Sequence, residues 1–577
     1  MTAVVIEREP TAAELEQTPL ARELELVREL LEAFGDARPP ARVATPRPAA
    51  TGFEPAVDRL ARLFGLSPFE RQLLLLAAAV ELDGDIAALA ASLQNGTDPR
   101  PTFGLALAAL PGSHWDALAP LSPLRRRRLL EPGAGSTLAS RPLGIDERIL
   151  HYLAGIDAPD RRLEGVLRAE VRTPMLAPSQ ERLAEELAYT AESAGARVLV
   201  RIDGDDADAS LGVANRLARA LGRTCLLVRA AALPAVGPDL AGLTRLVDRE
   251  ALLLDGLPVV DTEGAGAPVV TAFLEELEAP LVVALGEWTP RPGGRVVLHR
   301  AVRLPSPAEA RALWTAALGE PVARSLGTVV DELAQHFRIG AAAIDAVARE
   351  LSATTSAGGD TAATLRRLCR ERARVGLEGL AERIDPVARW DDLVLPDGHL
   401  GLLREIVRHV RHRTQVYERW GFGERTARGL GVTALFAGES GTGKTLAAEV
   451  LAAELGLDLY RIDLAATVSK YIGETEKNLS RLFDAAEASG AVLLFDEADA
   501  LFGKRGEVKD GHDRYANLEV AYLLQRMETY RGLAILTTNL RSNVDRAFLR
   551  RLRFVVRMAR PRYPSMRCSR YAISRFA

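Results

Sequence analysis

The chain has 577 residues, enough for three or four domains, because a single core stops growing at roughly 250 to 300 residues. Hydrophobic residues make up 48% and charged residues 26% of the sequence, a balance typical of folded globular proteins rather than disordered chains. The formal net charge of -4 excludes a global cationic field that would draw the molecule onto nucleic acid or an anionic membrane. Any such binding has to be local.

Cysteine usage and the first residues indicate a cytoplasmic protein. Cys225, Cys369 and Cys568 are far apart and form no C-x-x-C pair, which fits neither a disulfide framework nor a zinc site. The start, MTAVVIEREPTAAELEQ, carries acidic residues where a signal peptide needs a basic and then an apolar run. The most apolar stretch, Leu73 to Leu82, is too short to span a bilayer. We therefore expect a cytoplasmic location and no membrane partner.

The front of the chain is predicted to be mostly helical. Apolar residues spaced by three and four over residues 11–35 form one face of a helix, and a Pro-rich linker completes an N-terminal part of residues 1–51. Residues 52–178 are predicted to form a mostly helical domain. Within it, the run Arg125 to Arg128 fits either a solvated helix face or a nucleic-acid contact. The solvated face is the simpler interpretation.

Residues 179–375 are predicted to form an α/β module followed by its own helical bundle. Strand-like apolar runs alternate with helical patterns, which is typical of a parallel sheet. These runs are RVLVRIDG, TCLLVRA, EALLLDG, PLVVALG and RVVLHRAVRL. The segment Glu309 to Leu351 then has a helical pattern. A linker over residues 376–402 leads to a second α/β module at residues 403–556. The two modules look like two copies of the same architecture.

The second module contains a phosphate-binding pattern. GESGTGKT matches G-x-x-x-x-G-K-T, follows the strand-like VTALFA and precedes the helix-like LAAEVLAAEL, which is the context that the motif requires. Glycines let backbone N–H groups face phosphates at a helix N-terminus, Lys444 would reach the β and γ phosphates of ATP, and Thr445 would ligate Mg2+. A degenerate loop is the alternative. The predicted ATP-binding residues are Gly438, Glu439, Ser440, Gly441, Thr442, Gly443, Lys444 and Thr445.

Two further strand-like segments carry side chains suited to hydrolysis. AVLLFDEAD ends in Asp496, which would hold Mg2+ through water, and in Glu497, which would orient and deprotonate the attacking water. LAILTTN ends in Asn539, which would position that water or sense the γ-phosphate. Because the carboxyl ends of parallel strands meet at one edge of a sheet, these groups are predicted to face the phosphate loop.

The segment AFLRRLRF contains three clustered arginines, Arg550, Arg551 and Arg553. Such clusters are commonly surface charge. In a nucleotide enzyme, however, an arginine supplied by a neighbouring subunit can stabilise the charge of the transition state. That role would require an oligomer.

Together these segments resemble the AAA+ ATPases, specifically the AAA branch of ring-forming remodelling machines. GESGTGKT, SKYIGETEKN, LLFDEADALFGKR and TTNLRSNVDRAFLRRLRF occur in the family's order over about residues 391–556. The resemblance implies a P-loop parallel-sheet module with ATP and Mg2+ as cofactors. It assigns Asp496 and Glu497 to the Walker B role and Asn539 to sensor 1.

The resemblance to AAA+ ATPases also implies a role for the three clustered arginines and a class of binding partner. It places arginine fingers at Arg550 and Arg553, with Arg551 a rival because the spacing departs slightly from the family's commonest form. It implies a homo-oligomeric ring, with a hexamer as one candidate, that acts on a protein substrate. Together with the acidic net charge, it argues against nucleic acid as a partner.

The segment VSKYIGETEKN resembles the family's pore loop 1. Lys470, Tyr471, Ile472 and Gly473 fit the pattern in which an aromatic residue faces the central channel and grips a polypeptide. An aromatic side chain offers a large apolar contact area without demanding a particular partner sequence. The alternative is that Tyr471 packs into its own domain.

The first module lacks the nucleotide motifs. Its counterpart of the phosphate loop keeps Gly204 but has no Gly-Lys-Ser/Thr, and Asp205, Asp206 and Asp208 would repel phosphate. The segment EALLLDGLPVVD offers Asp255 without a following carboxylate. We predict a degenerate AAA-like module that binds no nucleotide, followed by its own helical lid. The front domain resembles the winged-helix-like N-terminal region of bacterial ATPases often encoded with contractile injection systems.

Three functions follow from these features. The leading one is an ATP-hydrolysing ring that remodels or threads protein; the alternatives are a DNA-directed AAA+ protein using its N-terminal domain and a nucleotide-gated scaffold with little hydrolysis. The tail, residues 557–577, breaks in composition from the preceding text and leaves no room for the family's C-terminal lid. We expect a truncated or frame-shifted end rather than a functional basic tail, with weak ATP binding and slow hydrolysis.

Overall fold

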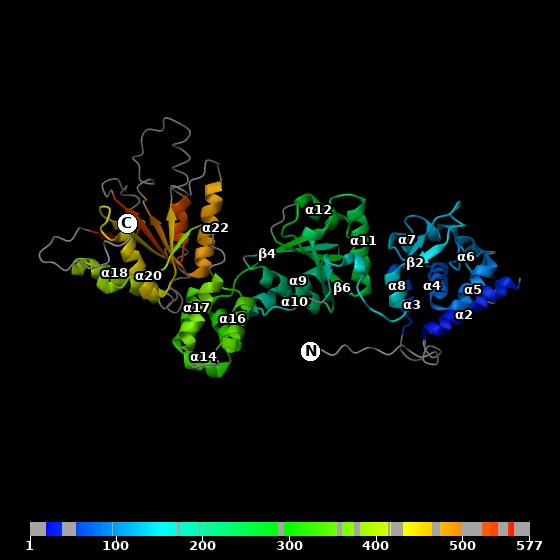
Figure 1. Cartoon of the computed structure of the whole chain (residues 1–577), viewed down its shortest axis with the longest axis horizontal. Helices are drawn as coiled ribbons and strands as arrows, with labels where there is room; N and C mark the ends of the chain where they lie inside the picture. The colour runs from blue at the N-terminus through cyan, green and yellow to red at the C-terminus, as the bar shows by residue number, and fades with distance from the viewer. Residues whose placement is uncertain are drawn as a thin grey trace, which may run out of the picture. The chain divides into compact units, whose positions relative to one another are not determined.

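The computed structural model of the chain describes fifteen stretches (Figure 1). They are residues 19–36, 54–94, 96–169, 173–195, 197–204, 206–286, 293–354, 360–373, 381–413, 416, 431–463, 474–496, 498, 522–539 and 552–558. The chain divides into two compact units, of which the first comprises Met1–Pro174 and Gln180–Arg303 and the second Met175–Ser179 and Leu304–Ala577. In the stretches that are described, every helix is too short or too polar to cross a bilayer.

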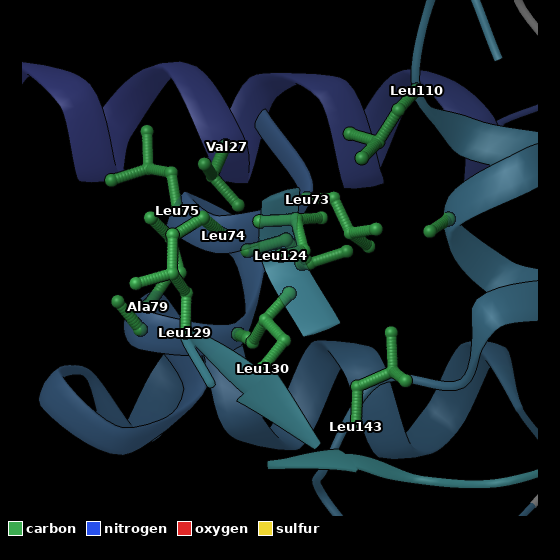
Figure 2. Close-up of a cluster of buried hydrophobic side chains, with 14 of the residues drawn as sticks. Val27, Leu73, Leu74, Leu75, Ala79, Leu110, Leu124, Leu129, Leu130 and Leu143 are labelled. Carbon is green, nitrogen blue, oxygen red and sulfur yellow. The ribbon is translucent and has the colours of Figure 1, made fainter. Parts of the chain in front are cut away.

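The first unit begins with a helical domain that includes a small β-hairpin. Its α-helices are α2 (Pro19–Gly35), α3 (Ala56–Phe64), α4 (Pro68–Leu82), α5 (Gly84–Leu93), α6 (Phe103–Ala109), α7 (Pro123–Arg126) and α8 (Glu147–Leu153). Strands β1 (Leu130–Pro132) and β2 (Leu143–Ile145) pair antiparallel. Ser67 and Glu70 form a capping box that fixes the start of α4. The four consecutive leucines of α4, residues 73–76, are buried in one cluster with Val27 of α2 and with Leu124 and Leu130, so the most apolar run of the chain lies in a core helix (Figure 2).

The remainder of the first unit is a six-stranded sheet. Its strands are β3 (Leu167–Arg168), β4 (Val198–Gly204), β5 (Thr224–Arg229), β6 (Gly256–Asp261), β7 (Leu281–Leu285) and β8 (Val296–Val302). The order across the sheet is β3-β5-β6-β7-β4-β8, with β3 antiparallel and the other neighbours parallel. The helices that connect or precede these strands are α9 (Pro178–Ser193), α10 (Ala207–Ala220), α11 (Pro238–Leu253) and α12 (Ala267–Glu276). Such strand-helix-strand crossovers are what parallel pairing requires.

One predicted strand of this module is wrong. The residues EALL of this run form the end of α11, and its final glycine begins the strand Gly256–Asp261. A short apolar run does not distinguish a buried helix from a buried strand, and Pro258 weakens the strand signal of GLPVVD because proline has no N–H to donate. Asp261 therefore ends the strand, whereas Asp255 stands before it with a φ of 47°.

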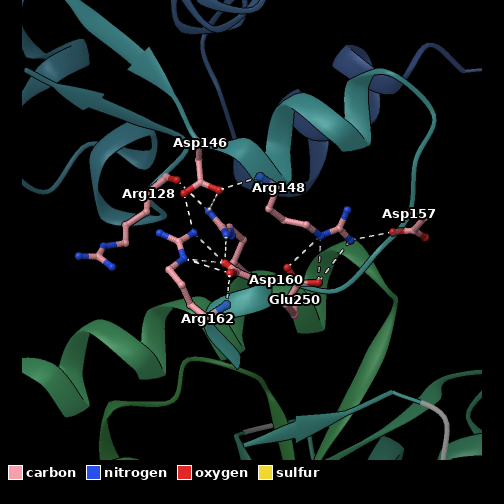
Figure 3. Close-up of polar contacts among 8 residues, drawn as sticks. Arg128, Asp146, Arg148, Asp157, Asp160, Arg162 and Glu250 are labelled. Carbon is pink, nitrogen blue, oxygen red and sulfur yellow. Dashed lines mark hydrogen bonds and ion pairs between the residues drawn. The ribbon is translucent and has the colours of Figure 1, made fainter. Parts of the chain in front are cut away.

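A buried network of charged residues joins the helical domain to this sheet (Figure 3). Three consecutive residues of α11, Asp248, Arg249 and Glu250, have side chains that are at most 5% exposed. Arg249 pairs with Asp146 at 3.2 Å, and Glu250 pairs with Arg148 at 3.1 Å. Burial raises the pKa of Asp248 to about 6. Because buried charges are tolerated only when they are paired, the two parts depend on each other.

The arginine run Arg125 to Arg128 takes part in this contact. Arg126 and Arg127 both pair with Glu278, which follows α12, and Arg249 donates to the backbone carbonyl of Arg128 at 2.8 Å. The expected solvated helix face is therefore incorrect for Arg127, whose side chain is 17% exposed. The run also loses much of its value as evidence for a nucleic-acid contact, because carboxylates of the same chain neutralise it.

The second unit starts with a helical bundle. Its helices are α13 (Pro307–Leu318), α14 (Glu320–Leu326), α15 (Thr328–His336), α16 (Ala341–Thr354) and α17 (Thr361–Ala373). They pack around the fully buried Trp314. The bundle contacts the following module where helix α22 (Glu474–Ser489) ends: Arg338 pairs with Glu487 at 3.0 Å, and a Cβ on Gly490 would lie 2.3 Å from the carbonyl oxygen of His336.

A second six-stranded sheet follows. Its strands are β9 (Glu382–Ile384), β10 (Val432–Ala437), β11 (Leu459–Asp463), β12 (Val492–Asp496), β13 (Leu533–Thr538) and β14 (Phe554–Arg557), and helices α18 (Asp397–Arg411), α20 (Lys444–Leu455) and α22 belong to the same module. The order is β14-β10-β13-β12-β11-β9, which is the order of the first sheet read from the other edge. Each sheet also has one antiparallel edge strand, β3 or β9. The predicted duplication of one α/β architecture is confirmed.

Candidate nucleotide-binding site

The loop between β10 and α20 has a backbone suited to binding an anion. Gly441 and Gly443 have φ values of 77° and 84°, a region that favours glycine. A Cβ on Gly438 would lie 2.2 Å from the carbonyl oxygen of Met558, so this position has no room for a larger residue. No described side chain caps the N-terminus of α20. A glycine-rich loop before an uncapped helix start fits a phosphate group.

Lys444 connects this loop to the end of β13. Its Nζ atom donates to the carbonyl oxygens of Gly438 at 2.8 Å and Glu439 at 3.0 Å, and to Oδ1 of Asn539 at 2.8 Å. These three bonds match the three donors of an ammonium group. The structure therefore brings together two predicted site residues that are 95 positions apart in the sequence.

Asp496 lies at the end of β12, at the same edge of the sheet. The Thr537 hydroxyl on β13 donates to its Oδ1 atom at 2.6 Å, and Nη2 of Arg461 on β11 lies 3.1 Å from its Oδ2 atom. The Asp496 side chain is 18% exposed. Side chains from the two neighbouring strands thus hold the carboxylate in place beside the phosphate loop.

Sequence reasoning missed Arg461 and Thr537. Both lie in strands that otherwise present apolar residues, and their importance depends on which strands are neighbours. A usable signal was present: an arginine in LYRID, a strand adjacent to the one that ends in Asp496, needs a carboxylate partner if it is partly buried.

Several predicted site residues lie outside the described residues. They are Lys470, Tyr471, Ile472, Gly473, Glu497, Arg550 and Arg551, together with the tail from residue 559 onward. Their assignments stay predictions. Glu497 is the next residue after β12, and Gly473 is the last residue before α22.

Arg553 does not lie with the other site residues of its own chain. Its side chain is exposed, and its backbone N–H donates to the Thr433 carbonyl at 3.1 Å, at the amino end of β10. The phosphate loop begins at the opposite end of that strand. At about 3.3 Å per strand residue, the two ends of β10 are separated by roughly 16 Å.

The first module keeps the turn but not the phosphate site. A Cβ on Gly204 would lie 2.3 Å from the Val302 carbonyl oxygen, a close approach like that of Gly438 to Met558. The Asp206 side chain then accepts a hydrogen bond from the backbone N–H of Ala209 and caps α10. Its own carboxylate therefore occupies the helix start that binds phosphate in nucleotide sites.

Three family models match the chain. Residues 434–562 match the ATPase family associated with various cellular activities (AAA), residues 13–167 match the winged helix domain variant, and residues 306–375 match the contractile injection system ATPase helical domain. The C-terminal half of the chain therefore contains a segment that matches AAA ATPases, and this segment follows in sequence a match to a winged-helix domain and a match to a helical domain of contractile-injection-system ATPases. The resemblance predicted from the motifs is confirmed.

Curated relatives come from different organisms, and some of them bear the name of an ATPase. The uncharacterised AAA family ATPase y4kL of Sinorhizobium fredii is 35% identical over 184 residues, which are 31% of this chain and 52% of that protein. Cell division protein C of Sulfolobus acidocaldarius is 27% identical over 191 residues, 31% of this chain and 48% of that protein. The peroxisomal ATPase PEX6 of Arthrobotrys oligospora is 28% identical over 315 residues, 51% of this chain and 25% of that protein. The alignments thus span about half or less of these relatives.

Proposed function

We propose that the chain binds ATP with Mg2+ at the carboxyl edge of its second sheet and hydrolyses the nucleotide in a homo-oligomeric ring that remodels or threads protein substrates. The observation that carries this proposal is the convergence of Lys444, Asp496 and Asn539. Lys444 and Asn539 are 2.8 Å apart, and Asp496 ends the adjacent strand. An ammonium group, a carboxylate and an amide beside a glycine-rich loop are among the groups that ATP-hydrolysing sites use.

Each residue then has a definite role. The loop N–H groups and Lys444 bind the phosphates. To do so, Lys444 gives up its hydrogen bonds to the loop carbonyls and donates to phosphate oxygens instead. Thr445 and Asp496 are the residues that would hold Mg2+, and the ion would supply positive charge against the phosphates. Glu497 takes a proton from the attacking water, and Asn539 positions that water.

A protein substrate is supported by the position of the predicted pore loop. Lys470 to Gly473 directly precede α22, and the other end of α22 leads through Gly490 into β12, which ends in Asp496. A structural change at the nucleotide site is therefore connected to Tyr471 through one strand, β12, and one helix, α22. The relative in Arthrobotrys oligospora bears the name of a peroxisomal ATPase, which supports ATP hydrolysis as the activity.

Tyr471→Ala is expected to keep basal ATP turnover within about twofold and to abolish work on protein, because an aromatic grip contributes to substrate contact and not to phosphate chemistry. The measurement is ATP-dependent unfolding of a fluorescent protein with an unstructured tail. Tyr189→Ala, which removes a 75% exposed tyrosine of α9, is the control. Undiminished unfolding by the Tyr471 variant would assign that side chain to packing in its own domain.

Arg550→Ala and Arg553→Ala are expected to lower ATP turnover by about 10³-fold or more without weakening ATP binding, because each arginine serves the site of a neighbouring subunit. The position of Arg553 at the far edge of its own sheet supports this expectation. Mixing either variant with Lys444→Ala should restore part of the turnover, since mixed interfaces pair an intact loop with an intact arginine. No recovery in assemblies shown to exchange subunits would refute the shared site. Arg324→Ala, at a 78% exposed side chain, is the control.

The two alternative functions make different predictions. A DNA-directed protein would need a free cationic surface on its front domain, but Arg126 and Arg127 are paired with Glu278. A nucleotide-gated scaffold would bind ATP without turnover above the level of the Glu497→Gln variant.

A further inference from the structure

Arg461 has no role in the proposed reaction, although it touches the predicted metal site. It lies in β11, where it is paired in register with Leu494 of β12, and Asp463 stands opposite Asp496. The Arg461 side chain extends towards the end of β12 and places Nη2 3.1 Å from Oδ2 of Asp496. A positive charge therefore already stands beside the carboxylate that would hold Mg2+.

Asp496 is the principal partner of this guanidinium. Arg461 also lies 3.8 Å from Glu382 on β9, but the Glu382 side chain is 72% exposed, against 18% for Asp496. Because the Arg461 side chain is 43% exposed, solvent screens both pairs, and it screens the pair with the less exposed carboxylate of Asp496 less strongly. Within the described part of the chain, the buried Nε atom of Arg461 has no hydrogen-bond partner. The charge of Asp496, rather than a full set of bonds, fixes the position of the side chain.

We propose that Arg461 is a positioning residue that acts as the resident counter-ion of Asp496 and sets the Mg2+ concentration at which the nucleotide site loads. This inference rests on the proposed function. Arginine stays protonated in proteins, so its charge is removed only by moving the side chain. Mg2+ approaching Asp496 meets a cation already paired with Oδ2, and the two cations repel each other.

The consequence is a site with two electrostatic states. Without the metal, Arg461 offsets the negative charge of Asp496, which would otherwise face the phosphates of ATP with a like charge. With Mg2+ present, the guanidinium gives up part of this contact and Glu382 is the carboxylate within reach. Arg461 thus opposes metal loading while stabilising the metal-free site.

The test is the Mg2+ dependence of binding of a fluorescent ATP analogue to the full chain, measured by anisotropy without reference to turnover. In Arg461→Gln the half-saturating Mg2+ concentration is expected to fall about fivefold or more, because the competing charge is gone. Arg461→Lys keeps the charge and should retain a value close to the parent. Glu382→Gln, which removes the other carboxylate near Arg461 and leaves the pair with Asp496 intact, is the matched control and should not lower the value.

The outcomes separate the two proposals. An unchanged or higher Mg2+ requirement in Arg461→Gln, in protein that binds the analogue at saturating Mg2+, would overturn the counter-ion role alone. A purely structural role would also give a higher requirement, together with a lower thermal unfolding temperature. If Arg461→Gln does not fold, Arg461→Met provides a second neutral variant of similar length. If the parent chain binds no analogue at saturating Mg2+, both the proposed function and the role of Arg461 are wrong.

Discussion

Lys444→Ala is expected to weaken ATP binding by about 100-fold or more, since each hydrogen bond to a charged group contributes about 1.5–3 kcal/mol. In the structure the ammonium group of Lys444 already lies at the phosphate loop, where it donates hydrogen bonds to the carbonyl oxygens of Gly438 and Glu439 and to the side chain of Asn539. Removing the ammonium group takes away the lysine cation with which the motif GESGTGKT contacts the phosphates. Equilibrium titration with a fluorescent ATP analogue measures the effect.

The control for this experiment is Glu497→Gln, which removes the proposed base and keeps the phosphate contacts. It should bind the analogue as tightly as the parent and turn over little ATP. Equal affinity in Lys444→Ala and the parent would exclude this loop as the binding site. Retained turnover in Glu497→Gln would remove Glu497 from its proposed role.

Arg249→Ala is expected to destabilise the first unit by about 3 kcal/mol, because it removes a fully buried cation and leaves Asp146 and Asp160 only the partly exposed Arg162. The Arg249 side chain is fully buried and pairs with Asp146 and Asp160, and it also donates to the Arg128 carbonyl. The change therefore removes contacts that cross the boundary between the helical domain and the sheet. Hydrogen exchange of the α11 amides at increasing urea concentration reports the loss locally.

The matched control is Arg324→Ala, which breaks an ion pair with Glu320 whose side chains are 78% and 71% exposed. Exposed helix pairs contribute about 0.3–0.5 kcal/mol, so α11 protection should not change. If Arg249→Ala and Arg324→Ala had the same effect on α11, the buried network would not hold the two parts together.

Much of the fold could be predicted because its signals are local. Alternating strand and helix patterns identified both α/β modules, and the phosphate loop was found because its glycines, lysine and threonine are adjacent in sequence. EALLLDG was assigned wrongly since a run of four or five apolar residues satisfies the core of a helix and of a strand equally well. The strand that follows contains Pro258, which disguised it.

Contacts between distant segments could not be read from the sequence in the same way. The arginine run at residues 125–128 looked solvated because its partners, Asp248 and Glu278, come more than a hundred residues later. Arg461 was missed for a similar reason, since its pairing with Asp496 follows from the neighbouring positions of β11 and β12. By contrast, the closeness of Lys444 and Asn539 could be expected because the carboxyl ends of parallel strands share one edge.

The proposed active site, shared between neighbouring subunits, predicts how ATP turnover depends on assembly. Turnover per chain should be measured across a range of protein concentrations in which light scattering follows oligomer formation. If an arginine from one subunit completes the site of the next, turnover per chain will rise as the oligomer forms and then reach a plateau, whatever its absolute rate. Turnover per chain that stays constant through assembly, or ATP consumption that survives in Lys444→Ala, would contradict an ATPase built from Lys444, Asp496 and a neighbour's arginine.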